Sequence, residues 1–121
     1  MSERDDIDRR LPVWCALSDL FLDTEQQDED YRWIARRLNE SGYGKAELRR
    51  ILDEEVAPAF AFNLFDIAGH WGGWTESQVL DLVTRAQDEW AAFNLAKRTL
   101  VRSHLDAEWA RLEPLIAMVE D

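Results

Sequence analysis

The chain has few of the groups that constrain a fold covalently or direct a protein to a membrane. It has a single cysteine, Cys15, in 121 residues, so no disulfide can form within it. No stretch approaches the ~18 uncharged apolar residues of a membrane span. The first residues, Met1 to Asp6, are acidic and polar, whereas a signal peptide begins with basic and then apolar residues. We therefore expect a cytoplasmic protein that does not associate with membranes; the alternative is delivery by a route that the sequence does not show.

Residues that carry chemistry are equally scarce. The two histidines, His70 and His104, lie 34 positions apart, a poor spacing for a zinc site. The chain has neither a Gly-x-Ser-x-Gly elbow nor a phosphate-binding glycine loop. Cys15 lies inside a predicted helix with no neighbouring cation, which indicates a core thiol. We expect no enzyme, no cofactor and no bound metal; the enzymatic alternative is an inward-facing cluster of carboxylates with raised pKa values.

Basic side chains are in the minority. The chain has 14 lysines and arginines against 25 acidic residues, a formal net charge of −11. Such a surplus repels nucleic acid and anionic membranes and attracts basic proteins. One local group of basic residues is predicted to pair with neighbouring acids rather than to bind nucleic acid: Arg36, Arg37, Lys45, Arg49 and Arg50 with Glu40, Glu47, Asp53 and Glu54. We therefore expect a basic protein partner and no nucleic acid.

Only three prolines and five glycines interrupt the chain, and the apolar residues between them recur at helical spacing. No segment alternates like a strand. These patterns predict an all-α fold, a single compact bundle of five or six helices over residues 1–121 with a flexible, acidic N-terminus at 1–8. Helices are expected to begin at Leu11–Pro12, at Thr24, near Gly44, at Pro58 and at Thr75.

Four of these helices have further signals. Thr24 with Gln27 and Thr75 with Gln78 fit capping boxes, and Gly42 is placed to end the second helix in a left-handed conformation. Pro58 is expected to prevent the third helix from continuing. The segment from Pro58 to Ala68 is apolar around most of its circumference, which predicts the central helix of the bundle.

The C-terminal part carries two apolar stripes of near-heptad spacing, from Val79 to Phe93 and from Leu105 to Val119. Ser103 with Asp106 fits the start of a new helix, so we expect two helices. One long helix through residues 99–105 is the alternative, because no glycine or proline forces a break there. The stripes would form either an internal hairpin or the seam of a homodimer.

Two groups of side chains are candidates for binding a partner. The first is acidic and consists of Asp23, Glu25, Asp28, Glu29 and Asp30, with Asp53, Glu54 and Glu55. Exposed acids steer a basic partner, although acids in a first helical turn also simply stabilise the helix. The second is aromatic and consists of Trp33, beside the acidic run, and of His70, Trp71 and Trp74 in a glycine-containing loop. These tryptophans would anchor a partner or fold back onto the bundle.

Several separated motifs occur in order over roughly residues 9–85: VWCALSDLFLDTE at 13–25, ILDEEVAP at 51–58, Asn63-Leu64 and AGHW at 68–71. Together they resemble a family of small bacterial proteins of unknown function, and the tail after Trp90 is less typical of it. The resemblance implies no catalytic residues. In size, acidity and helical character the chain is also similar to the immunity proteins that bacteria pair with secreted toxins.

We therefore expect an acidic binding protein that neutralises or regulates a basic partner by occlusion, as a toxin immunity protein does. The alternative is a self-associating structural or regulatory helical module.

Overall fold

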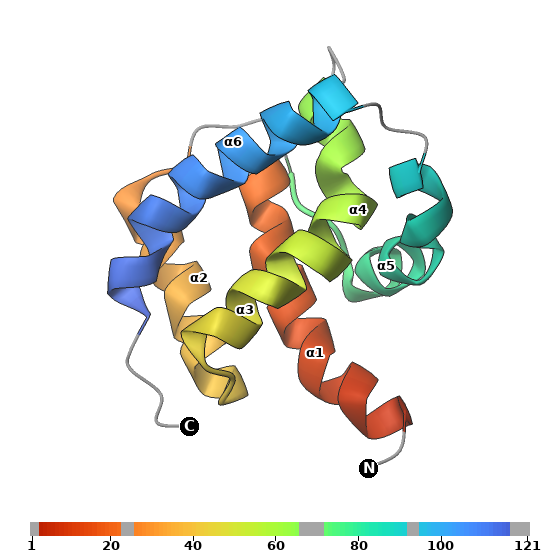
Figure 1. Ribbon diagram of the computed structural model, residues 1–121. Helices are drawn as coiled ribbons and strands as arrows, with labels where there is room; N and C mark the ends of the chain where they lie inside the picture. Colours follow the sequence, from red (N-terminus) through yellow and green to blue (C-terminus); the bar gives the residue numbers. More distant parts are fainter. Residues whose placement is uncertain (1–2, 23–25, 66–71, 92–94, 117–121) are drawn as a thin grey trace.

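The structure, a computed structural model, describes residues 3–22, 26–65, 72–91 and 95–116 (Figure 1). Within these ranges the chain is helical and forms no strand, which confirms the predicted all-α fold. The α-helices are α1 (Glu3–Ser18), α2 (Asp28–Ser41), α3 (Lys45–Ile51), α4 (Ala57–Phe60), α5 (Glu76–Ala91) and α6 (Leu95–Leu112). Shorter helical turns are η1 (Asp19–Phe21), η2 (Leu52–Val56), η3 (Ala61–Phe65) and η4 (Glu113–Leu115).

Helix α1 contacts several of the other elements. It packs against α2, α5 and η2, while α4 packs on α5 and α2 on α6 (Figure 1). The predicted stripes form the core: Val13, Leu17, Leu20 and Phe21; Tyr31, Ile34, Ala35 and Leu38; and Leu48, Ile51, Leu52 and Val56 are all buried. The rings of Phe21 and Phe60, 6.4 Å apart between centroids, join the first of these stripes to α4.

Helix α1 begins at Glu3 and not at Leu11–Pro12, so residues 3–8, expected to be flexible, are helical. A proline inside a helix removes a hydrogen bond, and Pro12 does lie inside α1. The turns before it are held by tertiary contacts, because Ile7 and Leu11 pack against the core. The Arg9 guanidinium also lies 4.0 Å from the centre of the Tyr43 ring, just beyond α2.

Pro58 does not break the helix that precedes it. The turn η2 is a π-helix, in which the N–H of Ala57 donates to the carbonyl of Leu52, five residues back. The extra residue in this turn places Pro58 in the first turn of α4, where a proline needs no N–H partner. The chain therefore stays helical from Lys45 to Phe65, and the predicted break is wrong.

The predicted central helix is central only in its first half. Phe60 and Ala61 are fully buried, but η3 is a 3-10 helix, in which residues three apart share a face. Phe62 and Phe65 consequently lie together on the outside and are 38% and 36% exposed. The end of the predicted segment, residues 66–68, lies outside the described residues.

The glycine and capping signals are mostly confirmed. Gly42 ends α2 at φ 80°, in the left-handed region, and Gly44 precedes α3. The capping box at the start of α5 forms, with Thr75 N 2.9 Å from Gln78 Oε1 and Gln78 N 3.2 Å from Thr75 Oγ1. The N-cap of α2, however, is Gln27, whose N–H donates to the Asp30 carboxylate at 2.8 Å. Thr24 lies outside the described residues.

The C-terminal part forms two helices as predicted, but the junction between them is elsewhere. Helix α6 runs through Ser103 without a break, and the junction falls between Ala91 and Leu95. The physical reason is one uninterrupted buried face, formed by Val101, Leu105, Trp109 and Leu112. A new helix at residue 103 would have divided this face.

Asn63 is the buried polar side chain on which η3 depends. It is 3% exposed, and its Nδ2 donates to the carbonyl of Phe21 at 2.7 Å, which ties η3 to η1. Asn63→Ala leaves that carbonyl without this donor, so we expect a loss of about 2 kcal/mol in the free energy of unfolding, measured by urea denaturation. The exposed control Ser77→Ala should change it by less than about 0.5 kcal/mol. Equal effects in the two variants would contradict this role.

Asp19 makes stability depend on pH. Burial, and secondarily the charge of Asp30, raise the pKa of Asp19 from 3.8 to about 6. Because the folded pKa is the higher one, the stabilising contribution is complete below about pH 4 and is lost as the pH rises through 6. If Asp19 were fully buried, its pH-dependent contribution to the free energy of unfolding would be about 3 kcal/mol. Because Asp19 is partly exposed to water, we expect about 1–2 kcal/mol.

The variant Asp19→Asn cannot ionise at this position. Urea denaturation should therefore find it equal to the wild type near pH 3.5 and about 1–2 kcal/mol more stable at pH 7. A difference that does not grow with pH would show that Asp19 ionises in the folded protein as it does in the unfolded chain.

Candidate functional site

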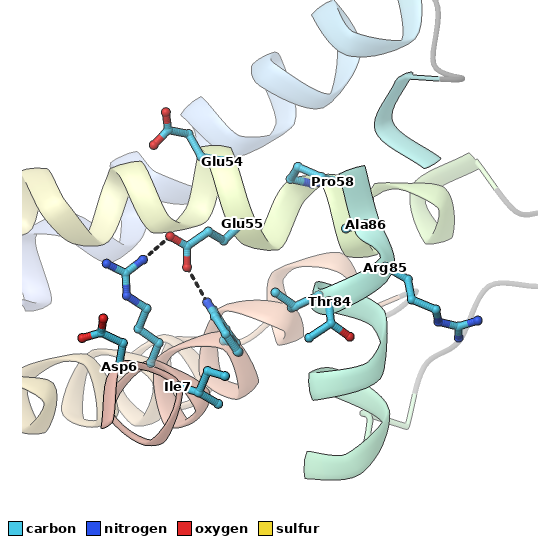
Figure 2. Close-up of a pocket in the computed structure, with 11 residues that line it drawn as sticks. Asp6, Ile7, Glu54, Glu55, Pro58, Thr84, Arg85 and Ala86 are labelled. Carbon is cyan, nitrogen blue, oxygen red and sulfur yellow. Dashed lines mark hydrogen bonds and ion pairs between the residues drawn. The ribbon is translucent and has the colours of Figure 1, made fainter. Parts of the chain in front are cut away.

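An open cleft of about 620 Å³ lies between α1, η2 and α5 (Figure 2). Three helical segments supply its walls: Asp6, Ile7, Arg10 and Trp14 from α1; Glu54, Glu55 and Pro58 from η2 and α4; and Val83, Thr84, Arg85 and Ala86 from α5. The size falls within the range of ligand-binding clefts. Its lining is mixed, with an apolar floor and charged groups around it.

Glu55 is the polar centre of this cleft. One of its oxygens accepts a hydrogen bond from the Arg10 guanidinium and the other from Trp14 Nε1 at 2.8 Å, as Figure 2 shows. Arg10 also lies 3.7 Å from the Glu47 carboxylate. The Arg10 and Glu55 side chains are only 28% and 26% exposed, so the pair is partly shielded from water. Glu55 therefore joins η2 to α1, and both of its oxygens already have donors.

The three acids at 53–55 do not form one surface. Asp53 accepts from Arg49 Nε at 3.0 Å, on the side of α6, and Glu55 faces α1. Glu54 is exposed and points away from the Arg10–Glu55 pair in Figure 2, with Arg50 Nε 3.7 Å away. Successive residues of a helix point in different directions, which separates a triad that is contiguous in the sequence.

The second acidic group lies at the start of α2. Asp28, Glu29 and Asp30 are exposed there, whereas Asp23 and Glu25 lie outside the described residues. Asp30 caps the helix, and Asp28 lies 3.5 Å from the Arg111 guanidinium. These contacts support the structural role that first-turn acids often have.

Trp33 is on the surface, with 41% of its area exposed. It lies one turn after Glu29, and residues four apart in a helix share a face. Arg37 lies 5.4 Å from the centre of the Trp33 ring. The outer face of α2 is therefore mixed in charge around its tryptophan.

Of the aromatic loop, only Trp74 is described; His70 and Trp71 lie outside the described residues. Trp74 is half-buried, and its ring centroid lies 4.7 Å from that of Phe60. With Phe62 and Leu82 it also lines a shallow depression of about 310 Å³. This tryptophan folds back onto the bundle, which is the structural alternative of the two that the sequence left open.

The other side chains that could take part in a reaction, Cys15 and His104, have environments typical of structural residues. Burial, followed by the charges of Glu76 and Asp19, raises the pKa of the Cys15 thiol to about 11, which disfavours the nucleophilic thiolate. His104 Nε2 lies 2.9 Å from the carbonyl oxygen of Leu20. In the part of the chain that the structure describes, no three metal-ligating side chains come together. No described helix is both long and apolar enough to cross a membrane.

Sequence reasoning missed the residues from α1, Arg10 and Trp14. They lie four apart, which places them on one helical face, so the signal was available. It was missed because Pro12 was interpreted as the first turn of the helix, which left Arg10 outside it. Their partner Glu55 is more than 40 positions away in sequence, and only the tertiary structure brings the three together.

Replacing Glu55 tests the bond between α1 and η2. Glu55→Ala removes both acceptors and leaves the partly shielded Arg10 with only the more distant Glu47. We expect a loss of about 2 kcal/mol in the free energy of unfolding at pH 7, below the value for a fully buried pair because water reaches this one. The neighbouring Glu54→Ala, whose side chain is exposed, should cost less than about 0.5 kcal/mol. Equal losses would contradict the assignment.

Comparison with known proteins gives one finding. A family described as a domain of unknown function (DUF7079) matches residues 8–115, which includes the whole cleft except its rim residues Asp6 and Ile7. The match extends past the stretch whose motifs suggested a family, into the tail after Trp90. No curated protein and no solved structure matches the chain. Because the match spans most of its length, the chain belongs to this uncharacterised family, DUF7079.

Proposed function

We propose that this chain is an acidic cytoplasmic protein that binds a basic protein partner and neutralises or regulates it by occlusion, as a toxin immunity protein does. The observation that carries the proposal is the cleft of about 620 Å³, which has an apolar floor and exposed acids beside it, in a chain of net charge −11. No step of chemistry is needed, because covering the partner's own site is sufficient.

The charge within the cleft supports a cationic occupant. Arg10 is paired with Glu55, and Arg85 is paired with Asp81 on the preceding turn of α5. Asp6 and Glu54 are exposed, and Glu54 has only a long contact with an exposed arginine. Surface pairs of that kind contribute little, so both carboxylates are available to a partner.

The floor of the cleft suits the stem of a lysine or arginine. Trp14, Pro58 and Ala86 are buried residues that line it. A basic side chain inserted there would lay its methylene groups on this floor and keep its charge near Asp6 and Glu54. The long-range charge would speed the encounter, and the contacts in the cleft would slow dissociation.

The start of α2 is a second surface that supports the same function. Glu29 and Trp33 lie exposed on one face, and an exposed tryptophan next to an acid suits the anchor of an interface. Asp28, already near Arg111, would contribute to steering rather than to a direct contact.

A self-associating helical module is the second candidate function. Leu95 and Leu100 on α6 are 80% and 61% exposed, unusual values for large apolar side chains. Their burial against a second copy would form a homodimer. The mass of the purified protein in solution tests this candidate directly.

The partner is sought by pull-down with tagged protein at low and high salt, followed by mass spectrometry. We expect one basic protein at stoichiometric level, released as salt screens the charges. The double variant Asp6→Lys/Glu54→Lys should weaken its binding about tenfold or more. The charge-matched control Asp8→Lys/Glu76→Lys replaces exposed acids that lie outside the cleft and outside α2, and it should reduce only the association rate.

Two other results would contradict this proposal. Equal weakening in the control variant would contradict the cleft as the binding surface. Recovery of no protein except the chain itself would overturn the proposed function and favour the self-associating module.

A further inference from the structure

The outer face of α2 lies at the edge of the bundle, because α1 and α6 contact the other side of this helix (Figure 1). Trp33 lies near the middle of the outer face and is 41% exposed, an unusual value for a tryptophan. Exposed charges of both signs flank it, with Glu29 one turn before it and Arg36 and Arg37 one turn after it. The tryptophan therefore lies between an acidic and a basic end of one surface.

These charges are not neutralised within the protein. Glu29 and Arg36 form no ion pair with any other described residue. Arg37 lies 3.6 Å from the Glu40 carboxylate, but the two side chains are 49% and 60% exposed. A surface pair of this kind contributes little to stability. Acidic and basic groups on this face are therefore both available to a partner.

The order of these residues is symmetric around Trp33. Glu29 lies four positions before Trp33 and Arg37 four positions after it, so the three share one helical face. A two-fold axis through Trp33 pairs α2 antiparallel with α2 of a second copy. Glu29 of each copy then lies opposite Arg37 of the other, with Arg36 beside it. Parallel pairing would place like charges opposite each other, so the charge pattern favours the antiparallel arrangement.

We propose that this face of α2 binds a second copy of the chain, and that the two α2 helices pair antiparallel around Trp33. The inference rests on the second candidate function, self-association, and gives it a surface other than the exposed leucines of α6. It does not depend on the function proposed for the cleft of about 620 Å³, because no residue of α2 lines that cleft.

Trp33 is the apolar centre of the proposed interface. The two indole rings meet at the axis, and a tryptophan at the centre of an interface is a typical hot spot. A shallow groove of about 300 Å³ borders the same face between α2 and η4, and a second copy lying along α2 would cover it too. Its lining consists of Arg32, Ala35, Arg36, Asn39 and Leu115. Leu115 is 41% exposed, so covering the groove adds apolar area to the interface.

The size of the surface predicts a weak dimer. Helix α2 has 14 residues and is therefore about 21 Å long. Two helices of this length bury less than the ~1,600 Å² of a standard interface, which is typical of transient association. The two copies have net charges of the same sign, but repulsion beyond about 8 Å is largely screened at physiological ionic strength. We expect a dissociation constant of about 10–100 µM.

Sedimentation equilibrium of the purified full chain at physiological ionic strength, over about 1–300 µM protein, measures this dimer. Trp33→Ala should weaken dimerisation about thirtyfold or more. Glu29→Arg should weaken it about tenfold, although this change makes the protein less acidic and reduces the long-range repulsion. The double variant Glu29→Arg/Arg37→Glu has the original net charge and again places opposite charges across the axis, so it should recover dimerisation.

Leu100→Lys is the control, because Leu100 is 61% exposed on α6, and this variant should dimerise like the wild type. Thermal unfolding shows that each variant is folded. The α2 interface is overturned, while self-association stands, if Leu100→Lys dissociates the dimer or if Trp33→Ala or Glu29→Arg fails to weaken it. Failure of the double variant to recover the dimer has the same meaning. A monomer at every concentration would overturn both the interface and the self-associating function.

Discussion

The helix from Lys45 to Phe60 crosses Pro58 because Ala57 donates its N–H to the carbonyl of Leu52, five residues back. This single π-helical turn sets the directions of the three acids it contains or adjoins. Glu55 faces α1, Glu54 faces solvent and Asp53 faces α6. The helix therefore forms one wall of the cleft beside α1 and α5 and one wall of a second cleft beside α6.

Ion pairs between neighbouring side chains set the charge in each of the two clefts that share this helix. In the cleft beside α1 and α5 the arginines are paired with acids, and exposed carboxylates remain. In a cleft of about 380 Å³ beside α6, Arg49 is paired with both Asp53 and Asp106. A net charge of −11 thus describes the field at long range. At contact distance the local pairs decide which ligand fits.

The buried stripes were predictable because helical periodicity is a local property. The stripe of α2 and the signals at Gly42 and Thr75 all agree with the structure. The failures occurred at Pro12 and Pro58, where local propensity disfavours a helix. At both, contacts or hydrogen bonding beyond the nearest neighbours outweigh that preference. The prediction of a new helix at Ser103 was wrong for a related reason, because the buried face of α6 continues through this residue.

The sequence by itself determined the all-α class, the apolar faces and the net charge, because each depends on composition or on residues within two helical turns. It also identified the acids at 28–30 and 53–55 as a group of interest. Only the tertiary structure decided which of these acids are exposed to a partner and which are bound within the protein. Glu55 meets Arg10 and Trp14 across more than 40 residues of chain, and Arg49 meets Asp106 across 57. Ion pairs between distant segments follow from how the helices pack, and no local pattern encodes that.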